Sequence, residues 1–422
     1  MADTTLEQFT SDATAFLASH CEHREDPKAR VWGEGSDKVA VFEEKSKDAE
    51  RRDVEASKQW RQTMFDAGFG WITGPTQYGG RALPGSYQRA FDDVSSNFQT
   101  PNQSPFGIGL GMVAPTFLAH GSDAAKEKYL RAMYRGDIVG CQLFSEPGAG
   151  SDLASLQTKA ERDGDEWVIT GQKVWTTGAQ FSDVGEVICR TDPNLPKHKG
   201  LTGFIVDMHS PGIEVRPLRQ MTGGASFNEV FFNEVHVPDQ NRLGDVNQGW
   251  TVALTTLMNE RASIGGGGGG GRSEMTALTR LSELLNAMGK GDDLVLRQEL
   301  INIFIHGQVQ KYSGMRAMAK MKAGQLPGPE MSTGKLALAM NMTRTSDFVS
   351  KVLGMKITAN SGEWGTYAWA DYVLGTPGMR IAGGSDEVMR NIVGERVLGL
   401  PKDVGIDSVT PFKDLKVGTQ KA

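Results

Sequence analysis

Apolar and polar positions follow two different periods along the 422-residue chain. In the first third, apolar residues recur at the three- and four-residue spacing of helices, as in Phe9, Ala13, Phe16 and Leu17. Short runs of period two follow, separated by turn residues, and predict strands at 166–170, 174–177, 184–190, 203–207, 213–216 and 229–237. Helical spacing then returns. The pattern predicts an α+β fold with a helical N-terminal domain (1–139), a small middle β-domain (140–245) and a helical-bundle C-terminal domain (246–422).

The charge and the cysteine content of the chain limit which cellular locations and which binding partners are expected. The chain has 45 basic and 51 acidic residues, a net charge of −6, which argues against a nucleic-acid partner. It lacks the run of about 18 apolar residues that a membrane span needs, and its N-terminus lacks the pattern of a secretory signal. Three widely spaced cysteines fit free thiols, so we expect a cytoplasmic location. His20, Cys21 and His23 lack a second ligand pair, and no metal site is expected.

The stretch 141–177 holds the candidate chemistry. It contains a turn of small residues at 148–150, where backbone N–H groups can approach a bound group closely. A hairpin follows, then a strand with Trp175, Thr176 and Thr177. An indole wall beside hydroxyls suits a planar heteroaromatic cofactor. Taken from spacing alone, a turn-rich entry to a β-domain with a core tryptophan explains the pattern better.

A second candidate lies on the helix expected after residue 247. Trp250, Ala253, Leu254, Leu257 and Met258 have the spacing of a buried stripe. Arg261 falls near the middle of this stripe and Glu260 at its edge. A charge in an apolar stripe needs a partner or a ligand, so this pair is either an internal ion pair or the end of a helix facing a cleft.

Two further stretches are unusual. Seven glycines occupy 265–271, but no strand precedes them and no βαβ unit surrounds them, so a dinucleotide-binding fold is rejected. The glycines either allow a neighbouring backbone or a ligand to approach closely, or they form a flexible linker. The charge-rich segment 26–53 is expected to be a solvated helix or excursion.

Several strings resemble one known family at its own spacing. EPGAGSD occupies 146–152 and GQKVWTT 171–177. ITGPTQYGGRALP, FNEVFFNEVHVP and RIAGGSDEVMRNIVGERVLGLP extend the likeness over nearly the whole chain. These strings resemble the acyl-CoA dehydrogenase family. Members of that family usually have a shorter segment at the place that residues 26–53 occupy in this chain. The resemblance implies a flavoprotein of fatty acid metabolism that holds FAD, an acyl-CoA substrate, an electron-transfer flavoprotein as acceptor, and a homotetramer.

The resemblance also implies a base. Removing hydrogens from the α and β carbons of a thioester needs a carboxylate for the proton and a flavin for the hydride. Many family members carry the glutamate as Y-E-G-T, but here that position is Gly383. A minority, such as isovaleryl-CoA dehydrogenase, carry it as L-x-x-E-R, which matches 257–261 and makes Glu260 the expected base. Asp386 and Glu387 are weaker candidates. The alternative is a structural pair of Glu260 with Arg261 and no base at all.

The resemblance places cofactor and substrate contacts as well. Ser151 is expected between the cofactor and the CoA arm, and Arg261 at the substrate end. The family's R-x-x-F-G segment, which holds the pyrophosphate, has no clear match, and Arg272, Arg280 and Arg297 are possible substitutes. The implied cofactor contacts are Gln142, Leu143, Phe144, Ser145, Ser151, Trp175, Thr176, Thr177, Ser385 and Glu387.

The same fold supports other functions. A flavin oxidase or monooxygenase would react with oxygen, and a partner subunit of a mixed tetramer would keep the fold without the chemistry. Glu260 argues against the last interpretation. Because Gly383 and the glycine run add no side-chain volume, we expect a wide acyl cleft that favours a branched or ring-bearing acyl group.

Overall fold

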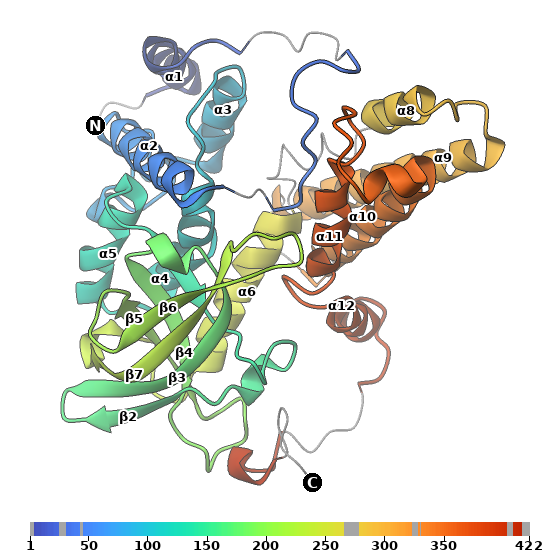
Figure 1. The fold of residues 1–422 in the computed structure, drawn as a ribbon. Coiled ribbons are helices and arrows are strands. Elements are labelled where there is room, and N and C mark those ends of the chain that lie inside the picture. Colours follow the sequence, from blue (N-terminus) through green and yellow to red (C-terminus); the bar gives the residue numbers. More distant parts are fainter. Residues whose placement is uncertain are drawn as a thin grey trace.

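The structure is a computed structural model that describes residues 4–24, 31–42, 45–265, 278–322, 328–329, 331–402 and 408–415. One mixed sheet lies beside a cluster of N-terminal helices, and a second group of helices projects away from both (Figure 1). The helix α6 connects the sheet to this second group. The α+β fold class expected from the sequence is confirmed.

The N-terminal helices enclose their own aromatic core. Phe9 and Leu17 of the first helix pack with Trp60 of the second and with Phe69 in the loop after it. Ser46 and Ser122 cap helix starts by accepting a backbone N–H three residues on. The helices are α1 (Leu6–His20), α2 (Lys47–Asp66), α3 (Gly85–Ser95), α4 (Ala114–His120) and α5 (Asp123–Arg135).

The sheet has the strand order β6-β7-β3-β2-β4-β5-β8, and β1 pairs with β4 in parallel. The expectation of separate strands at 166–170 and 174–177 is wrong, because β3 runs unbroken through both and absorbs irregularities near Gly171 and Trp175. The strands are β1 (Gly140–Leu143), β2 (Lys159–Asp163), β3 (Glu166–Thr177), β4 (Val184–Arg190), β5 (Leu201–Asp207), β6 (Ile213–Leu218), β7 (Phe227–Pro238) and β8 (Arg242–Leu243).

The C-terminal helices form a bundle around Leu281, Phe348 and Trp369. The segment 26–53 was expected to be a solvated helix or excursion, but among its described residues Val39 and Val41 lie buried in this bundle. The helices are α6 (Gly249–Gly265), α8 (Leu278–Ala287), α9 (Leu294–Lys322), α10 (Met331–Leu353), α11 (Trp369–Met379) and α12 (Asp386–Ile392). Within the described ranges, no helix is long and apolar enough to cross a membrane.

The buried face of α6 differs from the expected stripe. Val252, Ala253 and Thr256 are buried, whereas Leu254 and Met258 are 37% and 52% exposed. Thr256 can be buried because its hydroxyl has polar partners, which apolar spacing does not reveal. Beyond Gly265, the rest of the glycine run lies outside the described residues.

A buried acid joins β4 to this face of α6. Glu186 has no exposed surface, and its Oε1 lies 2.6 Å from the Thr256 hydroxyl, which is 2.8 Å from the Thr116 hydroxyl. Across the part of the chain that the structure describes, its Oε2 has no hydrogen-bond partner and no cation pairs with it. Burial raises the pKa of Glu186 to about 8, so the side chain keeps its proton at neutral pH.

We predict that Glu186→Gln changes how stability depends on pH. The folded protein holds the Glu186 proton up to about pH 8, whereas the unfolded chain releases it near the ordinary value of about 4.3. The free energy of unfolding of the wild type therefore falls as pH rises between these values, by at most about 1.4 kcal/mol per pH unit. The variant has no such proton, so its melting temperature should gain on the wild type from pH 5 to pH 8.

Thermal unfolding measured across this range tests the prediction. Glu161→Gln, on the exposed strand β2, is the matched control and should run parallel to the wild type. Parallel curves for Glu186→Gln as well would show that Glu186 is ionised in the folded protein.

Candidate functional site

The two motifs of the stretch 141–177 meet where β1 ends. The chain after β1 lies against β3, because the Val174 N–H donates to the Ser145 carbonyl at 2.8 Å. Glu146 and Ala149 then exchange two backbone hydrogen bonds, of 2.9 and 3.1 Å, which close the turn of small residues. The glycine-rich turn and the strand that carries Trp175 are thereby held side by side.

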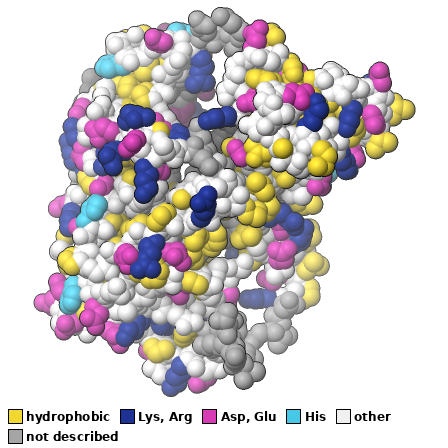
Figure 2. All heavy atoms as spheres, viewed as in Figure 1, with side chains coloured by type: hydrophobic (Ala, Val, Ile, Leu, Met, Phe, Trp, Pro, Cys, Tyr) yellow, Lys and Arg dark blue, Asp and Glu magenta, His cyan; other side chains and the backbone are white. Residues whose placement is uncertain are grey.

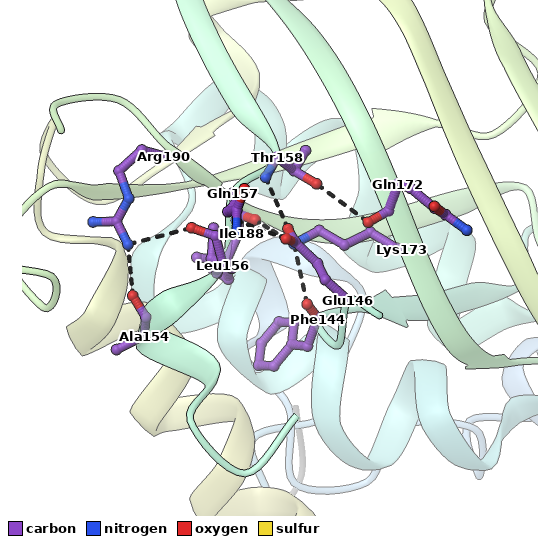
Figure 3. Close-up of polar contacts among 10 residues, drawn as sticks. All are labelled: Phe144, Glu146, Ala154, Leu156, Gln157, Thr158, Gln172, Lys173, Ile188 and Arg190. Carbon is purple, nitrogen blue, oxygen red and sulfur yellow. Dashed lines mark hydrogen bonds and ion pairs between the residues drawn. The ribbon is translucent and has the colours of Figure 1, made fainter. Parts of the chain in front are cut away.

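A buried ion pair fixes this junction (Figure 3). Lys173 Nζ lies 2.8 Å from Glu146 Oε1, and the two side chains are 0% and 7% exposed. The ammonium also donates to the carbonyls of Phe144 at 3.0 Å and Ile188 at 2.8 Å. The Glu146 carboxylate accepts the Gln157 and Thr158 backbone N–H groups at 2.6 and 2.9 Å. Glu146 and Lys173, although both belong to the sequence motifs, therefore stabilise the fold and do not face a ligand.

Glu146 remains ionised despite its burial. Desolvation would raise the pKa of its carboxyl, but the charge and hydrogen bond of Lys173, with the bonds from Gln157 and Thr158, lower the pKa below its usual range. The stabilisation that Glu146 contributes is therefore present above the ordinary pKa of a glutamate and is lost as pH falls through the lowered value.

A second buried cation shapes the loop after the turn. Arg190 donates to the carbonyls of Ala154 at 2.5 Å and Lys197 at 2.7 Å, and its guanidinium lies 3.8 Å from the centre of the Phe412 ring. Lys197 Nζ in turn contacts both Asp152 oxygens at 2.9 Å. Ser151, next to Asp152, is left exposed at the rim of the turn.

Trp175 presents its ring outward. It is 55% exposed and has a φ of +62°, a left-handed conformation that costs a bulky residue strain. Thr177 is also exposed, whereas Thr176 is 1% exposed and its hydroxyl has no partner among the residues described. The outward indole and the exposed threonine fit the expectation of a bound heteroaromatic ring, whereas the buried Thr176 can offer a ligand only its backbone.

The residues expected at the flavin edge do not all offer side chains. Leu143 is fully buried in the core of the sheet and Phe144 is 6% exposed in a neighbouring cluster. Gln142 and Ser145 are half-buried. Leu143 can therefore offer a ligand only its backbone, while Gln142 and Ser145 can offer polar side chains.

The expected base and the closing motif come together around Lys335 of α10. Lys335 is 1% exposed, and its Nζ donates to the Gly384 carbonyl at 2.5 Å. Burial lowers the pKa of Lys335, and the charges of Asp386, Glu260 and Glu387 act against this shift. The half-buried Glu260 thus shares an electrostatic neighbourhood with the turn that contains Gly383. Sequence reasoning missed Lys335, because a single lysine on a helix gives no signal of burial.

The start of α12 has a structural explanation of its own. Ser385 caps the helix by accepting the Val388 N–H at 3.3 Å, and Asp386 is bound by Arg380 Nε at 2.7 Å. The Glu387 side chain is 74% exposed and lies 3.6 Å from Arg390. Asp386 is thus engaged in an ion pair, whereas Glu387 is accessible to a ligand.

The remaining expected residues are only partly placed. Arg261 lies in α6, but its side chain and all of Arg272 fall outside the described residues. Arg280 donates to the Asp37 and Lys38 carbonyls at 2.8 and 3.2 Å, so its guanidinium holds backbone. At the start of α6 lies a hollow of about 490 Å³ lined by Leu195, His198, Lys199, Asn247, Gln248, Trp250 and Thr251.

We predict that Lys173→Met destabilises the fold strongly. Methionine keeps the length of the side chain but leaves the Glu146 carboxylate buried without its cation, which typically costs about 3–5 kcal/mol. Urea unfolding measures the loss. Lys159→Met removes a lysine from the exposed Lys159–Glu161 pair of β2 and should cost less than about 1 kcal/mol. Equal losses in the two variants would mean that burial of the Glu146–Lys173 pair has no energetic consequence.

Comparisons with known proteins agree along the chain. The acyl-CoA dehydrogenase N-terminal, middle and C-terminal domains match residues 37–137, 141–235 and 247–398. Acyl-CoA dehydrogenase IpdE1 of Mycobacterium tuberculosis is 34% identical over 363 residues, which cover 84% of this chain and 90% of that protein. Acyl-CoA dehydrogenase FadE34 of the same organism is 41% identical over 68% of this chain, but the match spans only 39% of that relative's length.

Solved structures show the same architecture. A variant of the Tcur3481-Tcur3483 steroid ACAD aligns with a TM-score of 0.71 and 25% identity, covering 94% of this chain and 99% of that one. The ChsE4-ChsE5 complex from Mycobacterium tuberculosis gives a TM-score of 0.66 at 25% identity, covering 96% and 100%. The chain belongs to the acyl-CoA dehydrogenase family of flavoproteins and is an oxidoreductase that acts on acyl-CoA.

Proposed function

We propose that this protein catalyses the FAD-dependent α,β-dehydrogenation of an acyl-CoA thioester to the 2-enoyl-CoA, with Glu260 as the base. The observation that carries the proposal is that α6, which carries Glu260, packs against α10, whose buried Lys335 donates to the Gly384 carbonyl beside Gly383. In relatives with Y-E-G-T, a carboxylate stands at the position of Gly383. Glu260 approaches the same neighbourhood from α6 and can take over its role.

We assign the following roles to the residues of the site. Glu260 would remove the α proton of the thioester, and FAD, when bound, would supply the acceptor for the hydride from the β carbon. Trp175 would cover one face of the cofactor ring, while Thr177 and the backbone at 142–145 would hold its polar edge. Ser151 lies at the rim, between the cofactor and the CoA arm. The hollow at the start of α6, which contains His198 and Lys199, suits the polar part of that arm.

Substitution of the base tests this mechanism. Glu260→Gln keeps the shape of the side chain but is not a base, so it should retain FAD and acyl-CoA binding while flavin reduction slows by about 10²–10⁴-fold. The measurement is loss of flavin absorbance on anaerobic mixing with acyl-CoA. Glu299→Gln, on the surface of α9 and paired with Lys351, is the control and should reduce normally. Normal reduction in Glu260→Gln would assign the base to another residue, and a protein that takes up no FAD would refute the function itself.

Assembly is part of the proposal. One face of α9 carries apolar side chains at helical spacing, and Figure 2 shows hydrophobic residues gathered over the projecting C-terminal helices. Such patches mark interfaces between subunits. Its members are Ile301, Ile305, Val309, Tyr312 and Met315, which are 43–63% exposed. We propose that this face joins subunits in a tetramer, either of identical chains or with a related partner. The ChsE4-ChsE5 structure, which is a complex of differently named proteins, supports the second arrangement.

The FAD pyrophosphate needs a cation, and of the arginines expected for this role Arg272 lies outside the described residues while Arg297 is exposed on α9. Arg280 is bound to the 37–38 backbone, and it is thereby removed from the candidates for this role. A neighbouring subunit can provide the missing contact in such an assembly. For this reason we place the pyrophosphate at the proposed interface and not within one chain.

We predict that a ring-bearing acyl-CoA is a better substrate than butyryl-CoA. Gly383 puts no side chain where related enzymes have a carboxylate, and a bulky acyl group filling this space buries apolar area worth about 25 cal/mol per Å². The solved relative named a steroid ACAD supports a large ring system as substrate. The test compares kcat/KM for butyryl-, octanoyl-, isovaleryl- and ring-bearing acyl-CoAs. A clear preference for butyryl-CoA would exclude a widened cleft.

A further inference from the structure

Residues 31–42, here called the strap, lie along the C-terminal helices as an irregular segment (Figure 1). Arg280 of α8 binds the Asp37 and Lys38 carbonyls, and the Asp37 carboxylate accepts the Gly365 N–H at 2.9 Å. The Trp364 indole donates to the Gly35 carbonyl at 3.0 Å. The strap is therefore fastened to the bundle along most of its length.

The strap also supplies part of the bundle core. Val39 and Val41 are 1% and 7% exposed. A Cβ on Gly375 of α11 would lie 2.9 Å from the Val41 Cβ, so only glycine allows this close approach. Gly378, one helical turn further, lies against the Phe42 ring, where a Cβ would be 3.3 Å from Cε2. The two glycines form a shallow surface on which the end of the strap rests.

Beyond this surface the strap reaches the proposed cofactor site. The Phe42 ring meets the Phe227 ring of β7 edge to face, with centroids 5.4 Å apart and an interplanar angle of 75°. Phe227 meets the Trp175 ring in the same way, at 5.9 Å and 76°. Three rings from the strap, β7 and β3 thus form a continuous row that ends at the outward indole.

Trp175 stands at the end of this row in a strained conformation. Its left-handed backbone directs the ring out of the sheet, and more than half of its surface is exposed. Among the described residues, the Phe227 ring is the aromatic group that contacts it. A strained residue persists when its surroundings fix it, and Phe42 supports Phe227 from the side of the bundle.

A purely structural role would need less. Val39 and Val41 already anchor the strap in the bundle, while the half-buried Phe42 packs against that core and also contacts Phe227 of the sheet. The row of rings therefore links the bundle that carries Glu260 to the residue that would cover the cofactor.

We propose that the strap positions the cofactor ring, with Phe42 holding Trp175 in place through Phe227. The proposal rests on the assignment of Trp175 to the FAD site. Phe42 is a positioning residue, because it acts on the cofactor only through two other rings. Its loss should loosen Trp175 and weaken FAD binding while the fold is retained.

Phe42→Leu tests the proposal with two readouts. The first is the ¹⁹F spectrum of cofactor-free protein labelled with 5-fluorotryptophan, in which one of the eight tryptophan resonances is assigned to Trp175 by its loss in Trp175→Phe. We expect this resonance to shift or broaden in Phe42→Leu. The second is the FAD dissociation constant, measured by quenching of FAD fluorescence, which should rise about two- to tenfold, the energy of one aromatic pair.

A matched control makes the same substitution elsewhere. Phe16→Leu removes a half-buried ring of α1 that contacts His20, Trp60 and Phe69, and should leave both readouts unchanged. A second pair of variants, one test and one control, changes no aromatic residue. Gly375→Ala pushes on Val41 and should displace the strap and the Trp175 resonance, whereas Gly314→Ala, with no neighbouring atom within 4 Å, should not.

The outcomes distinguish a failure of the strap proposal from a failure of the proposed function. An unchanged Trp175 resonance and an unchanged FAD dissociation constant in folded Phe42→Leu would overturn the strap proposal, even if the melting temperature fell. A wild-type protein that binds no FAD would instead overturn the proposed function. In that event the ¹⁹F comparison still decides whether Phe42 positions Trp175.

Discussion

The buried ion pair of Glu146 with Lys173 determines where the rest of the site lies. Moving both charges out of water costs several kcal/mol each, and this cost is offset only if every hydrogen-bonding group finds a partner. Here the three ammonium protons have three acceptors, Glu146 and the carbonyls of Phe144 and Ile188. The carboxylate also accepts two backbone N–H groups. Satisfying the pair therefore requires β1, β3, β4 and the chain before β2 to meet at one point, two residues from Trp175.

Three buried ionisable groups in this molecule are stabilised in three different ways. Glu146 keeps its charge because a lysine faces it. Lys335 lies at 4.0 Å from Asp386 and donates to a carbonyl, while burial still lowers its pKa. Glu186 has no cation among the residues described and keeps its proton instead. The protonated Glu186 thus joins the sheet to α6, while the charges of the Glu146–Lys173 pair and of Lys335 with Asp386 stabilise two other places.

The sequence predicted the three-part fold because the apolar spacing of strands differs clearly from that of helices. Its two motifs also indicated where the chain after β1 packs against β3. It failed where burial depends on partners far along the chain. Thr256 is buried through Glu186, seventy residues away, so the apolar stripe of α6 was misjudged. Val39 and Val41 looked solvated among charges, yet they enter a core built from residues after 278. Lys335 and Phe42 gave no signal, since neither belongs to a motif and each acts through tertiary contacts.

The surroundings of Lys335 support the proposal that Glu260 serves as the base in place of a glutamate at position 383. Lys335 donates to the carbonyl of Gly384, next to the position where Y-E-G-T relatives have their glutamate. It also senses the charge of Glu260 from another helix. In the proposed function, a carboxylate at either place would act on the same buried ammonium through its charge. What the move does change is the side-chain volume at 383, and glycine there leaves space that a larger acyl group can fill. If Glu260 is the base, as proposed, its position and the size of the substrate would be linked, because a base on α6 leaves residue 383 free to be glycine.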